Sequence, residues 1–108
     1  MEFAEGNILS NSKTDSKEEI FDTLFSGKNI TIERIISSGQ TSPASGWYDQ
    51  KKNEWVLLLE GEAKIEFENK LIKNLKKGDY LMIPANYRHK VTYTSIDPPC
   101  LWLAVFFD

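Results

Sequence analysis

Residues 54–89 decide the fold, and they read EWVLLLEGEAKIEFENKLIKNLKKGDYLMIPANYRH. The stretch opens with a carboxylate ahead of an apolar run, turns at Glu60-Gly61, and continues into an alternation of apolar and charged residues. It ends at His89, the only histidine of the chain. Alternation with a period of two is typical of β-strands, so the stretch predicts several short strands joined by turns.

Two of these strands have distinct patterns. Residues 54–59 are apolar on both faces after Glu54, which predicts a strand buried between two layers. Gly61 follows at once and can supply the positive φ of a tight hairpin. In residues 63–67 apolar and charged side chains alternate strictly, which predicts a half-buried strand.

Strand patterns continue on both sides of this stretch. One side of a long strand at residues 30–36 carries three isoleucines and Arg34. Turn signals rich in Gly, Pro and Asn separate three further strands, which we expect at residues 80–83, 88–94 and 101–107. Short strands with such regular punctuation indicate an all-β sandwich or barrel of the jelly-roll kind.

Ahead of the strands, the apolar residues have the spacing of a helix. Residues 15–27 predict one short amphipathic helix that covers one end of the β structure. Ser16 and Glu19 resemble a capping box, and Gly27 suits the left-handed stop at the C-terminus of a helix. The apolar stripe of this helix consists of Ile20, Phe21, Leu24 and Phe25.

Size and composition predict one domain. The 108 residues are 41% hydrophobic and 27% charged, so we expect a single domain over residues 1–108. Residues 1–28 form a strand and helix segment in this prediction, and residues 29–108 form the barrel. A domain of this size has little excess stability, so burying a face in a partner helps it. We expect a homodimer, in which the segment around Asn7–Ser10 can add a strand to a neighbour.

Charge and cysteine content narrow the function classes. The net charge of −3 arises without a basic block, which disfavours nucleic acid as a partner. Cys100 is the only cysteine, so neither an intramolecular disulfide nor a cysteine-based zinc cage can form. The amino terminus lacks the pattern of a signal peptide, and no apolar run reaches the ~20 residues of a membrane span. We therefore expect a cytoplasmic protein without a membrane partner.

The second half of the decisive stretch resembles a known family. Gly78, Pro84 and His89 occupy the places expected in the second motif of the cupin superfamily, G-x5-P-x-G-x2-H-x3-N. Asn86 and Tyr93 replace the second glycine and the asparagine, so three of the five signature positions match. The resemblance implies a small single-domain cupin of the cupin-2 type, whose fold is an all-β cupin jelly-roll β-barrel, a double-stranded β-sandwich barrel.

The first cupin motif, G-x5-H-x-H-x3,4-E-x6-G, matches only in its second half. Glu54 and Gly61 fit, but Tyr48 and Gln50 stand where the two histidines belong. The chain resembles a cupin subgroup with Trp-Tyr-Asp-Gln ahead of Glu-Trp-Val and a Trp-Leu-Ala-Val strand near the end, as at residues 102–105 here. The likeness covers roughly residues 30–107.

The resemblance also implies a site. In metal-binding cupins the equivalent positions converge inside the barrel on a divalent transition metal, which here gives Gln50, Glu54 and His89 as ligands for Fe, Mn, Ni or Zn. We expect weak binding, because an amide is a poorer donor than imidazole. Tyr48, with a reference pKa of about 10, is expected as a hydrogen-bond donor in the pocket or as a residue of the barrel wall.

Each candidate has a plain structural alternative. His89 can be a structural histidine on a strand, and Glu54 can lie in solvent at the end of its strand. Arg34 can enter the pocket to hold a carboxylate or lie on the surface, and the loop at residues 39–46 is expected to edge the barrel mouth. Three tryptophans can form an aromatic floor or belong to the core, namely Trp47, Trp55 and Trp102.

Three functional hypotheses remain open. The first is a small cupin that binds a divalent metal weakly and transforms or senses a small polar molecule. The second is a metal-free module that binds a small-molecule ligand. The third is metal-free acid and base catalysis by Glu54 and His89, with Tyr48 beside them, as in an isomerase-like cupin. Whether the chain is an enzyme stays open at this point, because this barrel hosts unrelated functions.

Overall fold

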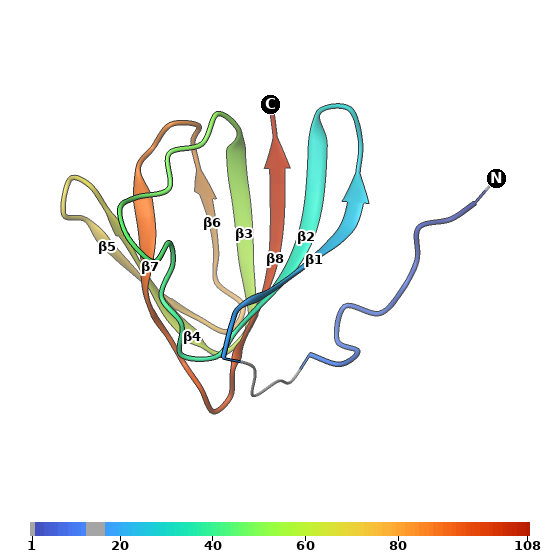
Figure 1. The fold of residues 1–108 in the computed structure, drawn as a ribbon, viewed down its shortest axis with the longest axis horizontal. Helices are drawn as coiled ribbons and strands as arrows, with labels where there is room; N and C mark the ends of the chain where they lie inside the picture. The colour runs from blue at the N-terminus through green and yellow to red at the C-terminus, as the bar shows by residue number, and fades with distance from the viewer. Residues whose placement is uncertain (1, 13–16) are drawn as a thin grey trace.

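The computed structural model describes residues 2–12 and 17–108. Strands dominate the described residues, and they form two antiparallel sheets (Figure 1). The all-β prediction is therefore confirmed. The strands are β1 Ile20–Ser26, β2 Ile30–Ser37, β3 Asn53–Glu60, β4 Glu62–Phe67, β5 Ile72–Lys76, β6 Tyr80–Ile83, β7 His89–Thr94 and β8 Cys100–Phe107.

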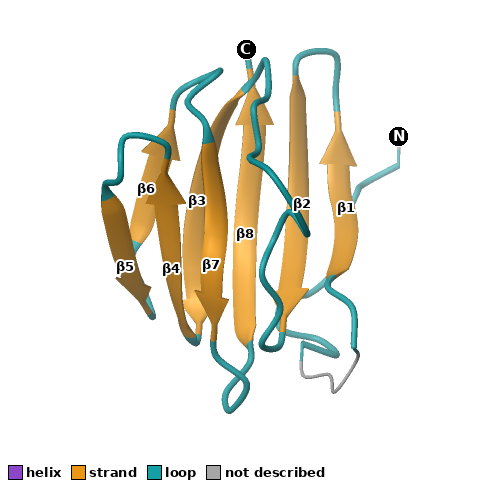
Figure 2. Ribbon diagram, turned by 60° about the vertical axis from the view of Figure 1, so that its left-hand side comes forward, coloured by secondary structure: helices purple, strands orange, loops and turns teal. Residues whose placement is uncertain are grey.

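The order of strands in the sheets differs from their order in the chain. The larger sheet runs β1-β2-β8-β3-β6 and the smaller one β5-β4-β7, as Figure 2 shows. The last strand, β8, lies between β2 and β3, which is the crossed connectivity of a jelly roll. Glu54 of β3 lies opposite Phe106 of β8 on one side and Ile83 of β6 on the other. This register places the first carboxylate of the decisive stretch inside the sheet.

The core lies between the two sheets and follows the predicted alternation. Ala63, Ile65 and Phe67 of β4 are 2%, 2% and 4% exposed, whereas Lys64 between them is exposed. Burying these alternate side chains against the facing sheet is the main stabilising contribution. The inward residues of the larger sheet that complete this cluster include Val56, Leu58, Ile83, Trp102 and Ala104.

The helix predicted for residues 15–27 is wrong. Residues 20–26 form the edge strand β1, which pairs with β2 from Ile20 opposite Ile36 to Ser26 opposite Thr31. A helix of this length is marginal in water, whereas pairing with β2 satisfies the backbone groups across the sheet. Ser16 of the predicted capping box lies outside the described residues. The described residues include no helix that could span a membrane.

The amino-terminal segment forms a turn in the single chain, so its predicted pairing with a neighbour stays a prediction. Asn7–Ser10 forms a turn, in which the Ser10 amide donates to the Asn7 carbonyl at 3.0 Å, and contributes no strand of its own. The edge strands of the larger sheet are β1 and β6, and on β1 the side chains of Phe21 and Phe25 are about half exposed. An edge strand with exposed apolar side chains favours pairing with another copy. The homodimer stays a prediction.

The turn at Gly61 is sharp, as predicted, but it does not close a hairpin. β3 and β4 lie in different sheets, so this turn carries the chain from one sheet to the other. Gly61 has φ +94°, and a Cβ atom there would lie 2.9 Å from Cys100 and from the Ser95 hydroxyl. Glycine is therefore required twice, by the backbone angle and by the close approach of β8.

Besides β1, one other strand was not predicted. β5, at residues 72–76, buries only Leu75 and exposes its other side chains, so it lacks the alternation that marks a strand. Its pairing with β4 creates it, from Ile72 opposite Glu66 to Lys76 opposite Glu62.

Gly61→Ala should lower the free energy of unfolding by the cost of a left-handed alanine, about 1–2 kcal/mol, plus an overpacking cost of about 1–3 kcal/mol. Gly78→Ala is the matched control, because Gly78 has φ +91° but no atom within 4 Å of an added Cβ. Urea unfolding of both variants measures the difference. Equal losses would mean that the contact with Cys100 and Ser95 carries no cost.

Candidate functional site

A cavity of about 220 Å³ opens between the two sheets. Apolar side chains form most of its exposed wall area, and polar side chains project between them, as in many small-molecule sites. Both sheets and the loop before β3 contribute. The lining residues are Glu19, Phe21, Glu33, Ile35, Ser42, Tyr48, Gln50, Glu54, Val56, Ile65, Ile83, His89, Val91, Trp102 and Phe106.

Glu54 and His89 face each other in this cavity. Glu54 comes from the start of β3 in the larger sheet, and His89 from the start of β7 in the smaller one. The Glu54 Oε1 and His89 Nε2 atoms are 3.4 Å apart, and the two side chains are 13% and 4% exposed. A buried carboxylate needs a cation, a hydrogen-bond donor or a proton. His89 can donate a hydrogen bond to Glu54 or give it a proton. Glu54 therefore does not lie in solvent at the end of its strand.

The orientation of His89 is fixed by the backbone around it. Its Nδ1 lies 2.8 Å from the Tyr87 carbonyl, which can only accept, so Nδ1 carries a proton and Nε2 faces Glu54. Burial lowers the pKa of His89, but the hydrogen bonds to Glu54 and to Tyr87 and the negative charge of Glu54 together raise it above the usual 6.5. The imidazole therefore holds its second proton more firmly than a histidine in water.

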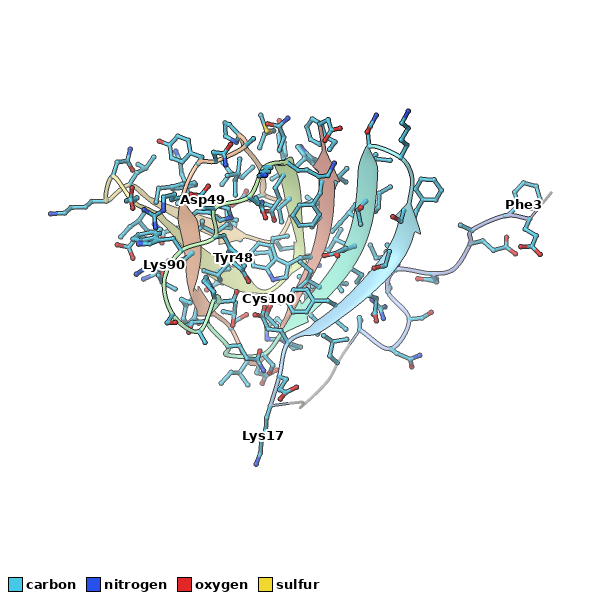
Figure 3. The ribbon with its side chains drawn as sticks, turned by 45° about the horizontal axis from the view of Figure 1, so that its top comes forward. Phe3, Lys17, Tyr48, Asp49, Lys90 and Cys100 are labelled. Carbon is cyan, nitrogen blue, oxygen red and sulfur yellow. The ribbon has the colours of Figure 1, made fainter. Side chains whose placement is uncertain are left out.

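Gln50 and Tyr48 reach the same site from the loop before β3. The Gln50 side-chain amide donates to Glu54 Oε1 at 2.9 Å. The loop is held against β7 by two backbone hydrogen bonds, from Tyr48 to His89 at 2.7 Å and in return at 3.1 Å. Figure 3 shows Tyr48 between the sheets, whereas Phe3 and Lys17 point away from them. The structure thus brings Tyr48, Gln50, Glu54 and His89 into one cavity.

Tyr48 is a protonated phenol in this setting. Burial raises its pKa, a hydrogen bond with Ser42 lowers it in part, and the negative charges of Glu19 and Glu54 raise it again. A neutral phenol can donate one hydrogen bond to a molecule in the cavity. It does not supply the phenolate that a metal would prefer.

Two further carboxylates line the cavity that the sequence analysis did not predict as site residues. Glu19 accepts a hydrogen bond of 2.6 Å from the Ser37 hydroxyl, which in turn accepts one of 3.3 Å from the indole of Trp102. Glu33 lies on β2, and its pKa is raised by burial and then by the charge of Glu54. The alternation of β2 could have identified Glu33, since its side chain lies on the same strand face as Ile35 and Arg34 lies on the opposite face. The isoleucines on the Arg34 face made that face look like the buried one.

Several weighed candidates lie elsewhere. Of the tryptophans only Trp102 lines the cavity, because Trp47 lies under the Lys90 ammonium at 4.3 Å and Trp55 stacks on Tyr80. Arg34 projects away from the cavity, where its guanidinium binds Asp22 at 2.7 Å and the carbonyls of Ile8 and Ser10. The aromatic floor and the pocket arginine are therefore wrong.

The donor set does not fit a tightly held transition metal. Glu54 and His89 offer two strong donor atoms, while Gln50 presents its amide nitrogen to Glu54 rather than its oxygen. Within residues 2–12 and 17–108, no three His, Cys, Asp or Glu side chains come close enough to hold one ion. Protein zinc sites use three or four protein ligands.

Solved structures resemble this chain over most of its length. A protein from Ralstonia eutropha JMP134, described as a "putative mannose-6-phosphate isomerase", is 41% identical, and the match covers 96% of this chain and 97% of that chain with a TM-score of 0.89. A cupin superfamily protein from Desulfitobacterium hafniense DCB-2 is 19% identical over 88% of this chain and 82% of its own, with a TM-score of 0.73.

A third structure supports the fold alone. It is an RmlC-like cupin family protein with a double-stranded β-helix fold from Methanocaldococcus jannaschii, 17% identical, covering 88% of this chain and 84% of its own with a TM-score of 0.70. A comparison with curated proteins returns no match. The family model described as "Cupin domain" matches residues 35–106, which is more than half of the chain. The chain therefore belongs to the cupin family.

Proposed function

We propose that the barrel cavity binds a small polar molecule and that Glu54 and His89 transfer protons on it as an acid–base pair. The observation that carries this proposal is the buried contact of 3.4 Å between the two groups, inside the cavity between the sheets. Titratable groups with perturbed environments in a cavity are typical of sites that move protons. The chain is an enzyme in this proposal.

The two groups have complementary roles. His89 Nε2 is the proton donor, since its raised pKa keeps the imidazole charged closer to neutral pH. The Glu54 carboxylate is the base, and the amide of Gln50 holds it in place. A substrate that reaches both can lose a proton to Glu54 while an oxygen gains one from His89. Tyr48 can donate to a second oxygen of the substrate.

The size and walls of the cavity limit the substrate. A volume of about 220 Å³ lies below the roughly 300–1,000 Å³ of drug-sized pockets, which suits a small metabolite. The 41% identical protein from Ralstonia eutropha is named for an isomerase of mannose 6-phosphate, a phosphorylated sugar, and only the isomerase class of reaction is carried over here. Moving a proton between neighbouring carbons of a hydroxy-carbonyl compound is a reaction that one acid and one base can perform.

Two other expectations stay predictions. Weak binding of Fe, Mn, Ni or Zn through Gln50, Glu54 and His89 is favoured by the cupin family, while the donor set opposes tight binding. Membership of the subgroup with Tyr48 and Gln50 at the histidine positions agrees with a site that works without a metal. If the protein transfers no proton, the hypothesis of a metal-free module that binds a ligand without converting it is the one that remains.

Proton transfer can be measured by deuterium incorporation. Incubated in D₂O with small hydroxy aldehydes and ketones, the chelator-treated wild type should exchange the hydrogen next to the carbonyl group of a substrate. Glu54→Gln and His89→Gln should each lower the exchange rate about 100-fold or more, because each removes one partner of the acid–base pair. Nuclear magnetic resonance follows the exchange directly.

The matched control for this assay is Glu66→Gln, which removes a charge from β4 outside the cavity lining. It should leave the exchange rate unchanged. Exchange in the Glu54 and His89 variants at the wild-type rate would reject the proposed roles, and exchange that depends on added metal would restore the metal hypothesis.

The pKa of His89 provides a second test. Glu54→Gln should lower it, because burial, which lowers the pKa, is then no longer offset by the carboxylate. His89 is the only histidine, so the Cε1 proton gives one resonance whose shift against pH reports this pKa in tag-free protein. An unchanged pKa in Glu54→Gln would show that the two groups do not interact in solution.

A further inference from the structure

We propose that the cavity selects its ligand by charge, taking molecules that carry a protonated amine most readily, uncharged polar molecules less so, and rejecting phosphorylated or carboxylated ones. This inference rests on the proposed function, since it concerns the ligand of the same cavity. It follows from which charged groups line the cavity and which do not.

Three carboxyl groups line the cavity, and they come from separate parts of the chain. Glu19 precedes β1, Glu33 lies on β2 and Glu54 on β3. His89 is the one basic side chain among the described lining residues, which include no lysine or arginine. Even a protonated His89 therefore leaves an excess of carboxyl groups over positive charges.

The surroundings make this excess effective. Most of the wall is aliphatic or aromatic, so charges inside interact through a medium that screens them less than water does. The raised pKa of Glu33, due to burial and to the charge of Glu54, agrees with a cavity that lacks compensating positive charge. The carboxylates would repel an anion that enters the cavity, whereas a ligand with an ammonium group would supply the positive charge that the lining lacks.

The cationic side chains around β2 and the loop before β3 lie outside the cavity lining. Arg34 is held on the other face of β2 by Asp22. Lys51 and Lys52 line an adjoining depression that shares Glu33, Gln50 and Phe106 with the cavity, and the Lys52 ammonium lies 2.6 Å from the Asp108 carboxylate. A phosphate could meet these lysines only outside the cavity.

Matched two-carbon probes can test the charge preference without knowledge of the natural ligand. Ethanolamine, ethylene glycol and glycolate have similar size and differ in charge, and inorganic phosphate represents the phosphorylated group. Each is titrated into tag-free protein at constant ionic strength and pH, and the His89 Cε1 resonance reports occupancy beside the Glu54–His89 pair. Ethanolamine should bind most tightly, ethylene glycol more weakly, and neither anion should shift the resonance saturably.

Variants assign the preference to the cavity. Glu33→Gln should lower the ratio of ethanolamine to ethylene glycol affinity roughly tenfold, because one of the attracting charges is removed. Glu66→Gln changes the net charge of the protein by the same amount outside the cavity and should leave the ratio unchanged.

The outcomes separate the two proposals. Saturable binding of glycolate or phosphate at least as tight as that of ethanolamine would overturn charge selection while leaving a ligand cavity in place. An equal change of the ratio in Glu33→Gln and Glu66→Gln would overturn it as well. If no probe shifts the resonance, the cavity does not bind small polar molecules, and the proposed function fails together with the inference.

Discussion

The contact between the Glu54 carboxylate and the His89 imidazole is the constraint on which the rest of the site depends. Placing both groups in an apolar barrel costs hydration free energy, and their attraction repays this only when the remaining hydrogen bonds are made. The structure makes them: Tyr87 holds Nδ1 of the imidazole, and Gln50 donates to the carboxylate. The paired backbones of Tyr48 and His89 tie the loop to the strand, so loop and pair are positioned together.

The side chains that line the cavity do not match the ligand for which the most similar of the three reported structures is named. The 41% identical protein from Ralstonia eutropha is named for a phosphorylated sugar, yet this cavity presents Glu19 and Glu33 in addition to the Glu54–His89 pair. A shared barrel preserves the place of the site, whereas the side chains that line it decide what enters. Gln50 and Tyr48 also line this cavity, and the side-chain amide of Gln50 donates to Glu54.

The sequence predicted well whatever depends on local alternation. The buried face of residues 63–67 follows from the period of two. Residues 54–59 were predicted to be buried on both faces, but only Val56 and Leu58 are fully buried, because the other face of β3 is not covered by a second layer. The convergence of Glu54 with His89 was implied by the resemblance to cupins, and the two side chains meet in the cavity.

The prediction failed where long-range pairing decides, since residues 20–26 have a helical stripe of apolar residues but become a strand by pairing with β2. Glu33 was not predicted as a site residue for a related reason. The face of β2 that points away from the cavity is apolar too, so hydrophobicity did not show which face of β2 points inward.

If the Glu54–His89 pair serves proton transfer rather than folding, the barrel should not need the pair for stability. Urea unfolding of Glu54→Leu/His89→Leu beside His89→Leu alone measures this. The double variant should be as stable as wild type or more stable by about 1–4 kcal/mol, while the single variant should lose about 3–5 kcal/mol because it removes the partner of a buried carboxylate. A double variant that loses as much as the single one would make the pair a structural element of the barrel.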